Sequence, residues 1–271
     1  MRDRISVSTV DGVADVRLQR PEKMNALDPE MFRALIETTD HLAKETSVRA
    51  VVLSGEGRSF CAGLDFASFT GMADSSESSG AALTELSPSG MTHYAQQAVF
   101  GWTELPMPVI AAVHGHALGG GIQLALGADI RIVHPEAKLS VLEIRWGLIP
   151  DMTGTQQLVD LVGPDVAKEL TFTGRMVSGT ECKELGLATR LSETPREDSL
   201  ALARGIAQKS PHAVRATKRL MSNAARLDRA TAFAREREEI GRLIGSANQA
   251  EAIASYFENR PAVFADPGIN E

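Results

Sequence analysis

The chain has 271 residues and a formal net charge of −7, with 43% hydrophobic and 23% charged residues. This composition is that of an ordinary globular protein, and the negative balance argues against a nucleic-acid surface, which needs clustered lysine and arginine. Cys61 and Cys182 form no disulfide framework and no metal-type spacing, so we expect reduced thiols in a cytoplasmic protein. We expect neither a signal peptide nor a membrane-spanning segment.

The first part of the chain predicts a β-hairpin followed by a helix. Ile5–Val10 and Val13–Leu18 alternate polar and apolar residues around an Asp-Gly pair, which is typical of a tight turn. Asp28 followed by Pro29 indicates a helix whose first turn is capped by the aspartate. The apolar run at residues 49–53 then predicts a short buried strand.

A segment rich in serine and glycine interrupts this pattern. Residues 68–90 show little apolar periodicity, and loops of this length in compact domains are usually functional or disordered. We therefore expect a mobile surface segment there. A helical pattern follows over residues 92–105 and ends at Pro106.

Three consecutive glycines lie at the centre of the sequence. An apolar run at residues 108–113 leads into HGHALGGG (114–121), and a helical pattern follows over residues 122–128. Glycines at a helix start let the backbone approach a ligand closely, and the free N–H groups of the first turn favour an oxygen that carries negative charge. A tight strand-to-helix turn with no ligand is the alternative.

The second half of the chain changes from mixed α/β to helical. Strands are expected at residues 129–133 and 138–141, with Asp151 as a candidate N-cap for the helix that follows. We expect further helices at 165–172, 179–185, 195–208, 211–224, 227–244 and 248–258, with one strand at 187–191. The prediction is an α/β core over residues 1–195 and a C-terminal helical region over residues 196–271.

Five segments in this order resemble the enoyl-CoA hydratase/isomerase (crotonase) superfamily over nearly the whole chain. They are RPEKMNALD (20–28), SFCAGLD (59–65), HGHALGGG (114–121), GRMVSGTECKELGLATRL (174–191) and SANQAEAIASYFENRPAVF (246–264). The resemblance implies an α/β spiral of strand–strand–helix units with a C-terminal helical region that forms a homotrimer or a dimer of trimers. It also implies an acyl-CoA substrate, so that coenzyme A enters as part of the thioester and no separate cofactor is needed.

Within this resemblance, two backbone amides would hold the thioester oxygen. They belong to Leu64, which follows the Ala-Gly pair of SFCAGLD, and to Gly120, the middle glycine. Proton abstraction beside a thioester creates an enolate oxyanion, and loss of one preorganised donor costs about 3–4 kcal/mol. The alternative for Leu64 is simple apolar packing.

Hydratases of this family use two glutamates, and this chain keeps a glutamate at only one of the two matching positions. Glu143 matches one of them. Its pKa is predicted to be raised towards that of a general base by its apolar neighbours, which are Val141, Leu142, Ile144 and Trp146. Gln123 stands at the other, and an amide cannot exchange protons at neutral pH, although it can orient a water. For Glu143 the alternative is a surface carboxylate at a strand end.

Asp151 resembles an acidic residue that dienoyl-CoA isomerases carry at this position, where hydratases have glycine. It is a candidate second proton carrier, and the helix N-cap is the equally favoured alternative. The favoured hypothesis is double-bond isomerisation with Glu143 as base. The alternatives are hydration, with Gln123 positioning the water, and a non-catalytic acyl-CoA-binding protein.

Further residues are candidates for contact with coenzyme A by their place in these motifs. They are Arg20, Lys23, Ala26, Ala62, Gly63, Leu64 and Phe257. Lys23 is instead solvated in the alternative interpretation, and Phe257 packs between subunits. We expect no metal site, because His114 and His116 lack acidic or cysteine neighbours and are better explained by packing or loop hydrogen bonds.

Overall fold

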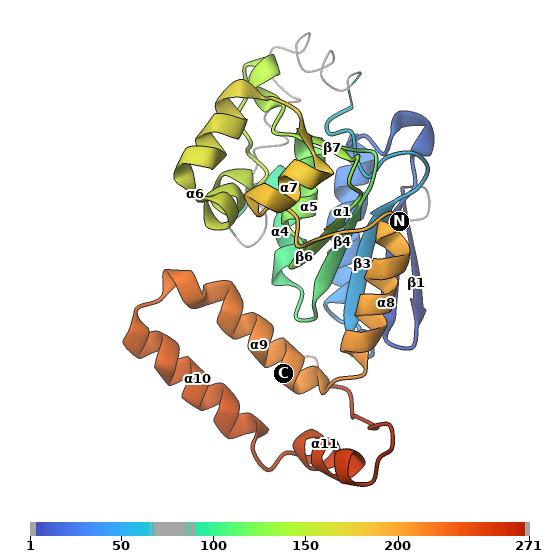
Figure 1. Cartoon of the computed structure of the whole chain (residues 1–271), viewed down its shortest axis with the longest axis vertical. Coiled ribbons are helices and arrows are strands. Elements are labelled where there is room, and N and C mark those ends of the chain that lie inside the picture. Colours follow the sequence, from blue (N-terminus) through green and yellow to red (C-terminus); the bar gives the residue numbers. More distant parts are fainter. Residues whose placement is uncertain (1–3, 66, 68–85, 87–89, 269–271) are drawn as a thin grey trace.

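The larger of the two sheets lies at the centre of the fold and combines a hairpin with parallel strands (Figure 1). The computed structural model describes residues 4–65, 67, 86 and 90–268. The strand order β1-β2-β3-β4-β6-β9 uses β1 (Ile5–Val10), β2 (Val13–Leu18), β3 (Ala50–Gly55), β4 (Val109–Val113), β6 (Ile130–Val133) and β9 (Arg190–Leu191). β1 pairs antiparallel with β2, and each later neighbour pairs parallel. The predicted hairpin is confirmed, with positive φ at both Asp11 and Gly12 in its turn.

A second, smaller sheet lies beside the first and makes the chain a spiral. It contains β5 (His116–Leu118), β7 (Lys138–Ser140) and β8 (Val177–Ser178). The chain passes from β4 in the large sheet to β5 in the small one, then through α5 (Gly120–Leu126) back to β6 and again to β7. This is the predicted repetition of strand–strand–helix units.

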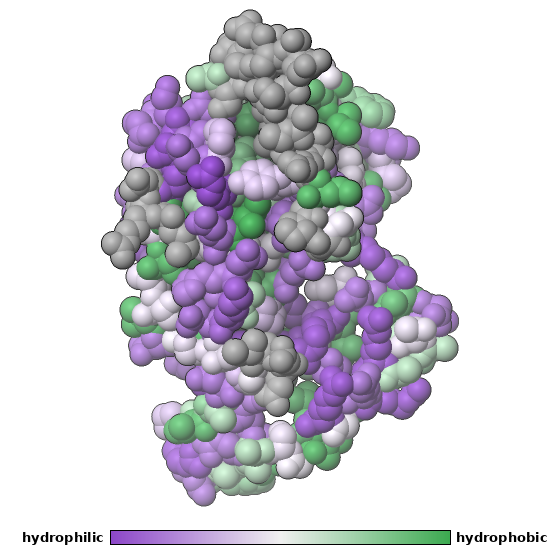
Figure 2. Space-filling view, turned by 180° about the vertical axis from the view of Figure 1, so that it is seen from behind, coloured by the Kyte–Doolittle hydropathy of each residue, from purple (hydrophilic) through white to green (hydrophobic). Residues whose placement is uncertain are grey.

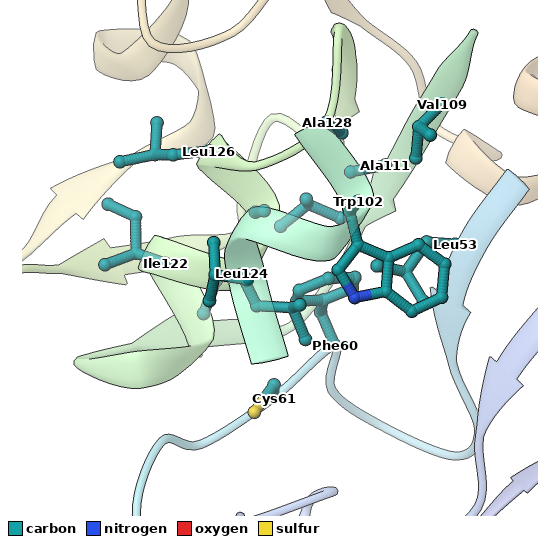
Figure 3. Packing of buried hydrophobic residues seen from close by; sticks show 14 of the residues in the cluster. Leu53, Phe60, Cys61, Trp102, Val109, Ala111, Ile122, Leu124, Leu126 and Ala128 are labelled. Atoms are coloured by element: carbon teal, nitrogen blue, oxygen red, sulfur yellow. The ribbon is translucent and has the colours of Figure 1, made fainter. Parts of the chain in front are cut away.

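Helices cover both faces of the main sheet. α1 (Pro29–Leu42) and α4 (Tyr94–Glu104) pack on one face with α5, and α8 (Pro195–Ala207) packs on the other. The middle strands β3 and β4 are therefore buried along their whole length. Figure 3 shows the indole of Trp102 from α4 packed in this core with Leu53, Val109 and Ala111.

The two predicted helix starts have different outcomes. Asp28 caps α1 as predicted, and its Oδ1 accepts a hydrogen bond from the Met31 amide at 2.8 Å. The N-cap interpretation of Asp151 is wrong. α6 (Gly154–Thr173) begins three residues later, and Thr153 precedes it with a φ of 70° and no side-chain cap. Asp151 lies instead in an exposed turn.

The C-terminal helices extend away from the sheet (Figure 1). α7 (Gly179–Leu185) comes before α8 in the chain. After α8 the helices are α9 (Pro211–Asn223), α10 (Arg229–Leu243) and α11 (Ala247–Phe257), and α10 buries none of its residues. An ion pair of 2.8 Å between Lys218 Nζ and Asp129 Oδ2 holds α9 to the core. The domain boundary at residue 195 stays a prediction.

None of the helices among the described residues is both long and apolar enough to cross a bilayer. On the face shown in Figure 2, hydrophilic side chains predominate and apolar ones are scattered. The predicted mobile segment, residues 68–90, lies almost entirely outside the described residues.

We predict that Asp28→Ala lowers the free energy of unfolding by about 1–2 kcal/mol, because it removes the α1 cap. The side chain also lies 2.8 Å from Arg4 and 3.5 Å from Arg20, so the variant leaves those charges without this partner. Urea unfolding measures the change. Asp40→Ala, an exposed aspartate on the same helix, is the control and should stay within about 0.5 kcal/mol of wild type.

Candidate active site

A buried asparagine joins the first two family-like motifs. Asn25 has no exposed surface, and its Oδ1 accepts a hydrogen bond from the Arg20 amide at 2.8 Å. Its Nδ2 donates to the carbonyls of Ser59 at 2.8 Å and Phe60 at 3.1 Å. Sequence reasoning missed this residue, since a polar residue in a loop gives no signal that distinguishes it from a solvated one.

Main-chain hydrogen bonds then set the direction of the Leu64 amide. The Leu27 amide donates to the Gly63 carbonyl at 2.7 Å, and the Asp65 amide donates to the Leu27 carbonyl at 3.0 Å. In such a ladder the residue between the two bonded groups points its own N–H to the other side. The Leu64 N–H accordingly has no acceptor within the described chain.

The second predicted donor lies next to the first. Gly63 has a φ of 85°, and a Cβ added there would clash with the Leu118 carbonyl and lie 3.5 Å from the Gly120 nitrogen. Gly120 opens α5, so its N–H has no acceptor within the helix. The fold thus brings the backbone of Gly63 and Leu64 against the start of α5, the arrangement that the family resemblance implies.

Glu143 lies beside this pair. A Cβ added at Gly119 would be 3.3 Å from Glu143 Oε1, so the carboxylate lies against the residue that precedes Gly120. Gln123, on α5, donates from Nε2 to the same Oε1 at 2.6 Å. Glu143 Oε2 is buried and accepts no hydrogen bond within the described chain. Gln123 therefore holds one carboxylate oxygen of Glu143 by a hydrogen bond, and the other oxygen has no such partner within the described chain.

Burial raises the pKa of Glu143 to about 7, with a smaller upward effect from the charge of Asp151. The sequence predicted this direction, but it attributed burial partly to Ile144 and Trp146. That attribution is wrong. Glu143 opens the short 3-10 helix η2 (Glu143–Trp146), whose later residues turn outward and leave Ile144 and Trp146 42% and 46% exposed.

The residues of the 20–28 loop and its neighbours that were predicted to contact coenzyme A differ in how exposed they are. Lys23 is exposed on the loop, and Ala26 and Ala62 lie beside it. The guanidinium of Arg20 is occupied inside the protein, 2.5 Å from Asp65 and 3.1 Å from the Ala26 carbonyl. Lys23 is thus the cation of this loop that faces solvent.

Phe257 is not brought to this site within one chain. It lies on α11, at the opposite end of the molecule from β7 and α6 (Figure 1), and is 80% exposed. The histidines make loop contacts: His116 Nδ1 lies 3.0 Å from Ser59 Oγ and His114 Nε2 lies 2.9 Å from the Gly57 carbonyl. No group of side chains suited to a metal occurs among the described residues.

A large hollow elsewhere in the molecule is a different kind of surface. It has a volume of about 1030 Å³ and opens between α4 and the C-terminal helices. Its lining includes the charged residues Glu104, Lys218, Arg219, Glu239 and Arg242. None of the predicted site residues is among the residues that line it.

Comparison with known proteins agrees with the fold and the motifs. The family model of enoyl-CoA hydratase/isomerase matches residues 8–267. The short-chain-enoyl-CoA hydratase of Clostridium acetobutylicum is 32% identical, over 92% of each chain. The mitochondrial methylglutaconyl-CoA hydratase of Homo sapiens is 30% identical, over 92% of this chain and 73% of that protein. The crystal structure of an enoyl-CoA hydratase from Bacillus anthracis superposes with a TM-score of 0.88 at 31% identity, covering 96% of this chain and 98% of that chain.

The chain belongs to the enoyl-CoA hydratase/isomerase family. It has the crotonase fold, as the motifs predicted, and it is an enzyme of the hydratase or isomerase kind. These findings favour an enzyme over the alternative of a non-catalytic binding protein.

We predict that Glu143 makes the protein less stable as pH rises. Its pKa is about 7 in the folded protein and 4.5 without burial, so the folded state binds the proton more tightly. The stability it contributes is present below about pH 4.5 and lost as pH rises through 7, by about 3 kcal/mol, because each unit of pKa difference is worth about 1.4 kcal/mol. Glu143→Gln should remove this decline in urea unfolding at a series of pH values.

The control is Glu184→Gln, because Glu184 is exposed. The free energy of unfolding of this variant should show the wild-type pH dependence. A Glu143→Gln curve parallel to wild type between pH 5 and 8 would contradict the raised pKa.

Proposed function

We propose that this enzyme moves a double bond along an unsaturated acyl-CoA thioester, with Glu143 as the proton carrier. The observation that carries the proposal is the asymmetric carboxylate of Glu143. Gln123 holds its Oε1, and Oε2 is buried without a partner within the described chain. A pKa of about 7 lets this carboxylate take a proton and give it back near neutral pH.

In the proposed isomerisation one side chain, Glu143, both removes the proton and returns it. On a 3-enoyl thioester, Glu143 Oε2 would take a proton from C2, and the electrons would pass to the thioester oxygen as a dienolate. The Leu64 and Gly120 amides would stabilise that oxygen. Oε2 would then return the proton to C4, so that the double bond lies between C2 and C3 and Glu143 is again ionised.

Hydration of a 2-enoyl thioester is the second candidate, because the relatives named above are called hydratases. Glu143 would take a proton from water, whose hydroxyl would add to C3, and would then protonate C2. In this hypothesis Gln123 positions the water, but its side chain is fully buried and already bonded to Glu143. We therefore prefer isomerisation.

For the coenzyme A part of the substrate we propose the loop that carries Lys23. Lys23 would meet phosphate, and the backbone of Ala26 and of the Ala62–Gly63–Leu64 segment would meet the remainder. Arg20 would act by holding the loop, because its guanidinium is bonded to Asp65 and the Ala26 carbonyl. Phe257 would contribute only from another subunit.

A homotrimer or dimer of trimers would suit the C-terminal region. α10 buries none of its residues, and Phe233, Ile240, Tyr256 and Phe257 are each more than half exposed. Apolar side chains in that number favour a subunit contact. We propose a cytoplasmic location, which the buried free thiols of Cys61 and Cys182 support.

We predict that Glu143→Gln lowers kcat for 3-enoyl-CoA and dienoyl-CoA isomerisation by about 10²–10⁴-fold, because the amide cannot carry the proton. Product analysis by chromatography measures the loss, and Asp151→Asn should lose less because Asp151 lies in solvent. Full turnover by Glu143→Gln would refute the proposal. If wild type instead removes the absorbance of 2-enoyl-CoA and leaves 3-enoyl-CoA unchanged, hydration is the reaction.

We predict that Gly63→Ala lowers kcat by about 10²-fold or more, the loss expected when an oxyanion donor is displaced. Its Cβ would meet the Leu118 carbonyl at a φ of 85°, so the backbone that carries the Leu64 amide must move. Gly205→Ala is the matched control, because nothing lies within 4 Å of a Cβ added there. Equal kcat values for wild type and Gly63→Ala would exclude the Leu64 amide as a donor.

A further inference from the structure

The Gln123 side chain is held in one orientation by the loop before α6. Its Oε1 accepts hydrogen bonds from the Met152 amide at 2.8 Å and the Gly154 amide at 3.0 Å. Only an oxygen can accept two N–H groups, so these bonds distinguish the oxygen of the amide from its nitrogen. Nε2 must therefore face Glu143 Oε1, which it contacts at 2.6 Å.

This arrangement leaves Gln123 little scope to hold a reacting water. Its side chain has no exposed surface. Both lone pairs of its oxygen are used, and one N–H is given to Glu143. Gly154 permits the close approach, because a Cβ there would lie 2.6 Å from Gln123 Oε1. The amide is thus part of the packing between α5 and α6.

The orientation of Gln123 determines which oxygen of Glu143 can take up a proton. With Oε1 bonded to Gln123, the proton that the carboxylate takes up must reside on Oε2, the oxygen without a partner in the described chain. The other groups that act on this carboxylate are its own backbone amide and the negative charge of Asp151. Among the described residues, Gln123 is the side chain that donates a hydrogen bond to this carboxylate.

We propose that Gln123 is a positioning residue for Glu143, which directs the single mobile proton to Oε2, and not a water-binding residue. The inference rests on the proposed role of Glu143 as proton carrier. Because the amide cannot ionise, the pair carries one proton in total. A glutamate at this position would keep the two backbone bonds to the α6 loop and add a second carboxylate against Oε1.

The test uses full-length Gln123→Leu and Gln123→Glu with ¹³C-carboxyl-labelled glutamate, where the Glu143 signal is assigned by its absence in Glu143→Gln. Loss of the donor in Gln123→Leu should raise the NMR titration midpoint of Glu143 by about one pH unit, as expected for a charge-assisted hydrogen bond. The acid limb of kcat/KM for 3-enoyl-CoA should move with it. kcat should fall at least about tenfold while KM changes less than about threefold.

Gln123→Glu preserves the shape of the site and should give a two-step titration shared by the two carboxylates. Asn248→Leu is the control, since it removes a buried amide with hydrogen bonds to His212 and Ala265 in the C-terminal region. It should lower Tm and leave the Glu143 midpoint unchanged.

A midpoint that stays at the wild-type value in both Gln123 variants would overturn the inference, whatever their Tm. Different results would refute the role of Glu143 as proton carrier and the role of Gln123 as positioning residue. Full turnover by Glu143→Gln removes Glu143 as proton carrier, whereas an inactive Glu143→Gln with unshifted Gln123 variants removes only the positioning role.

Discussion

The hydrogen bond from Gln123 Nε2 to Glu143 Oε1 is the contact on which the chemistry proposed for this protein rests. It joins α5, which begins with the predicted oxyanion donor Gly120, to Glu143, the first residue of η2 after β7. Burial alone would favour a neutral Glu143, while the donated N–H favours the ionised form. The balance leaves a carboxyl group with a pKa of about 7, which suits reversible proton transfer.

The surroundings of this pair are built mainly from backbone. Glycines at 63, 119 and 154 let main-chain atoms come close to Leu118, Glu143 and Gln123, and each added Cβ would collide or crowd there. Amides held by hydrogen bonds need no reorganisation when charge develops on a substrate.

Much of the fold could be predicted because its signals are local. The hairpin, the Asp28 cap and α7 (Gly179–Leu185) depend on neighbours a few residues apart. β5 and β8, with three and two residues, are too short to show periodicity, and pairing with β7 decides them. The cap assigned to Asp151 failed because Met152 and Gly154 give their amides to Gln123, a residue 29 and 31 positions away.

The sequence by itself determined the family, the α/β spiral and the candidate chemistry, because motif order and glycine positions are properties of the chain. It also showed that a glutamine stands where a second carboxylate would be. Only the tertiary structure decided which atoms that glutamine bonds. The same is true of the contacts that occupy Arg20 within the loop and of the distance between α11, which carries Phe257, and the site. Which atom a side chain faces depends on packing between distant segments, and a single sequence does not record that packing.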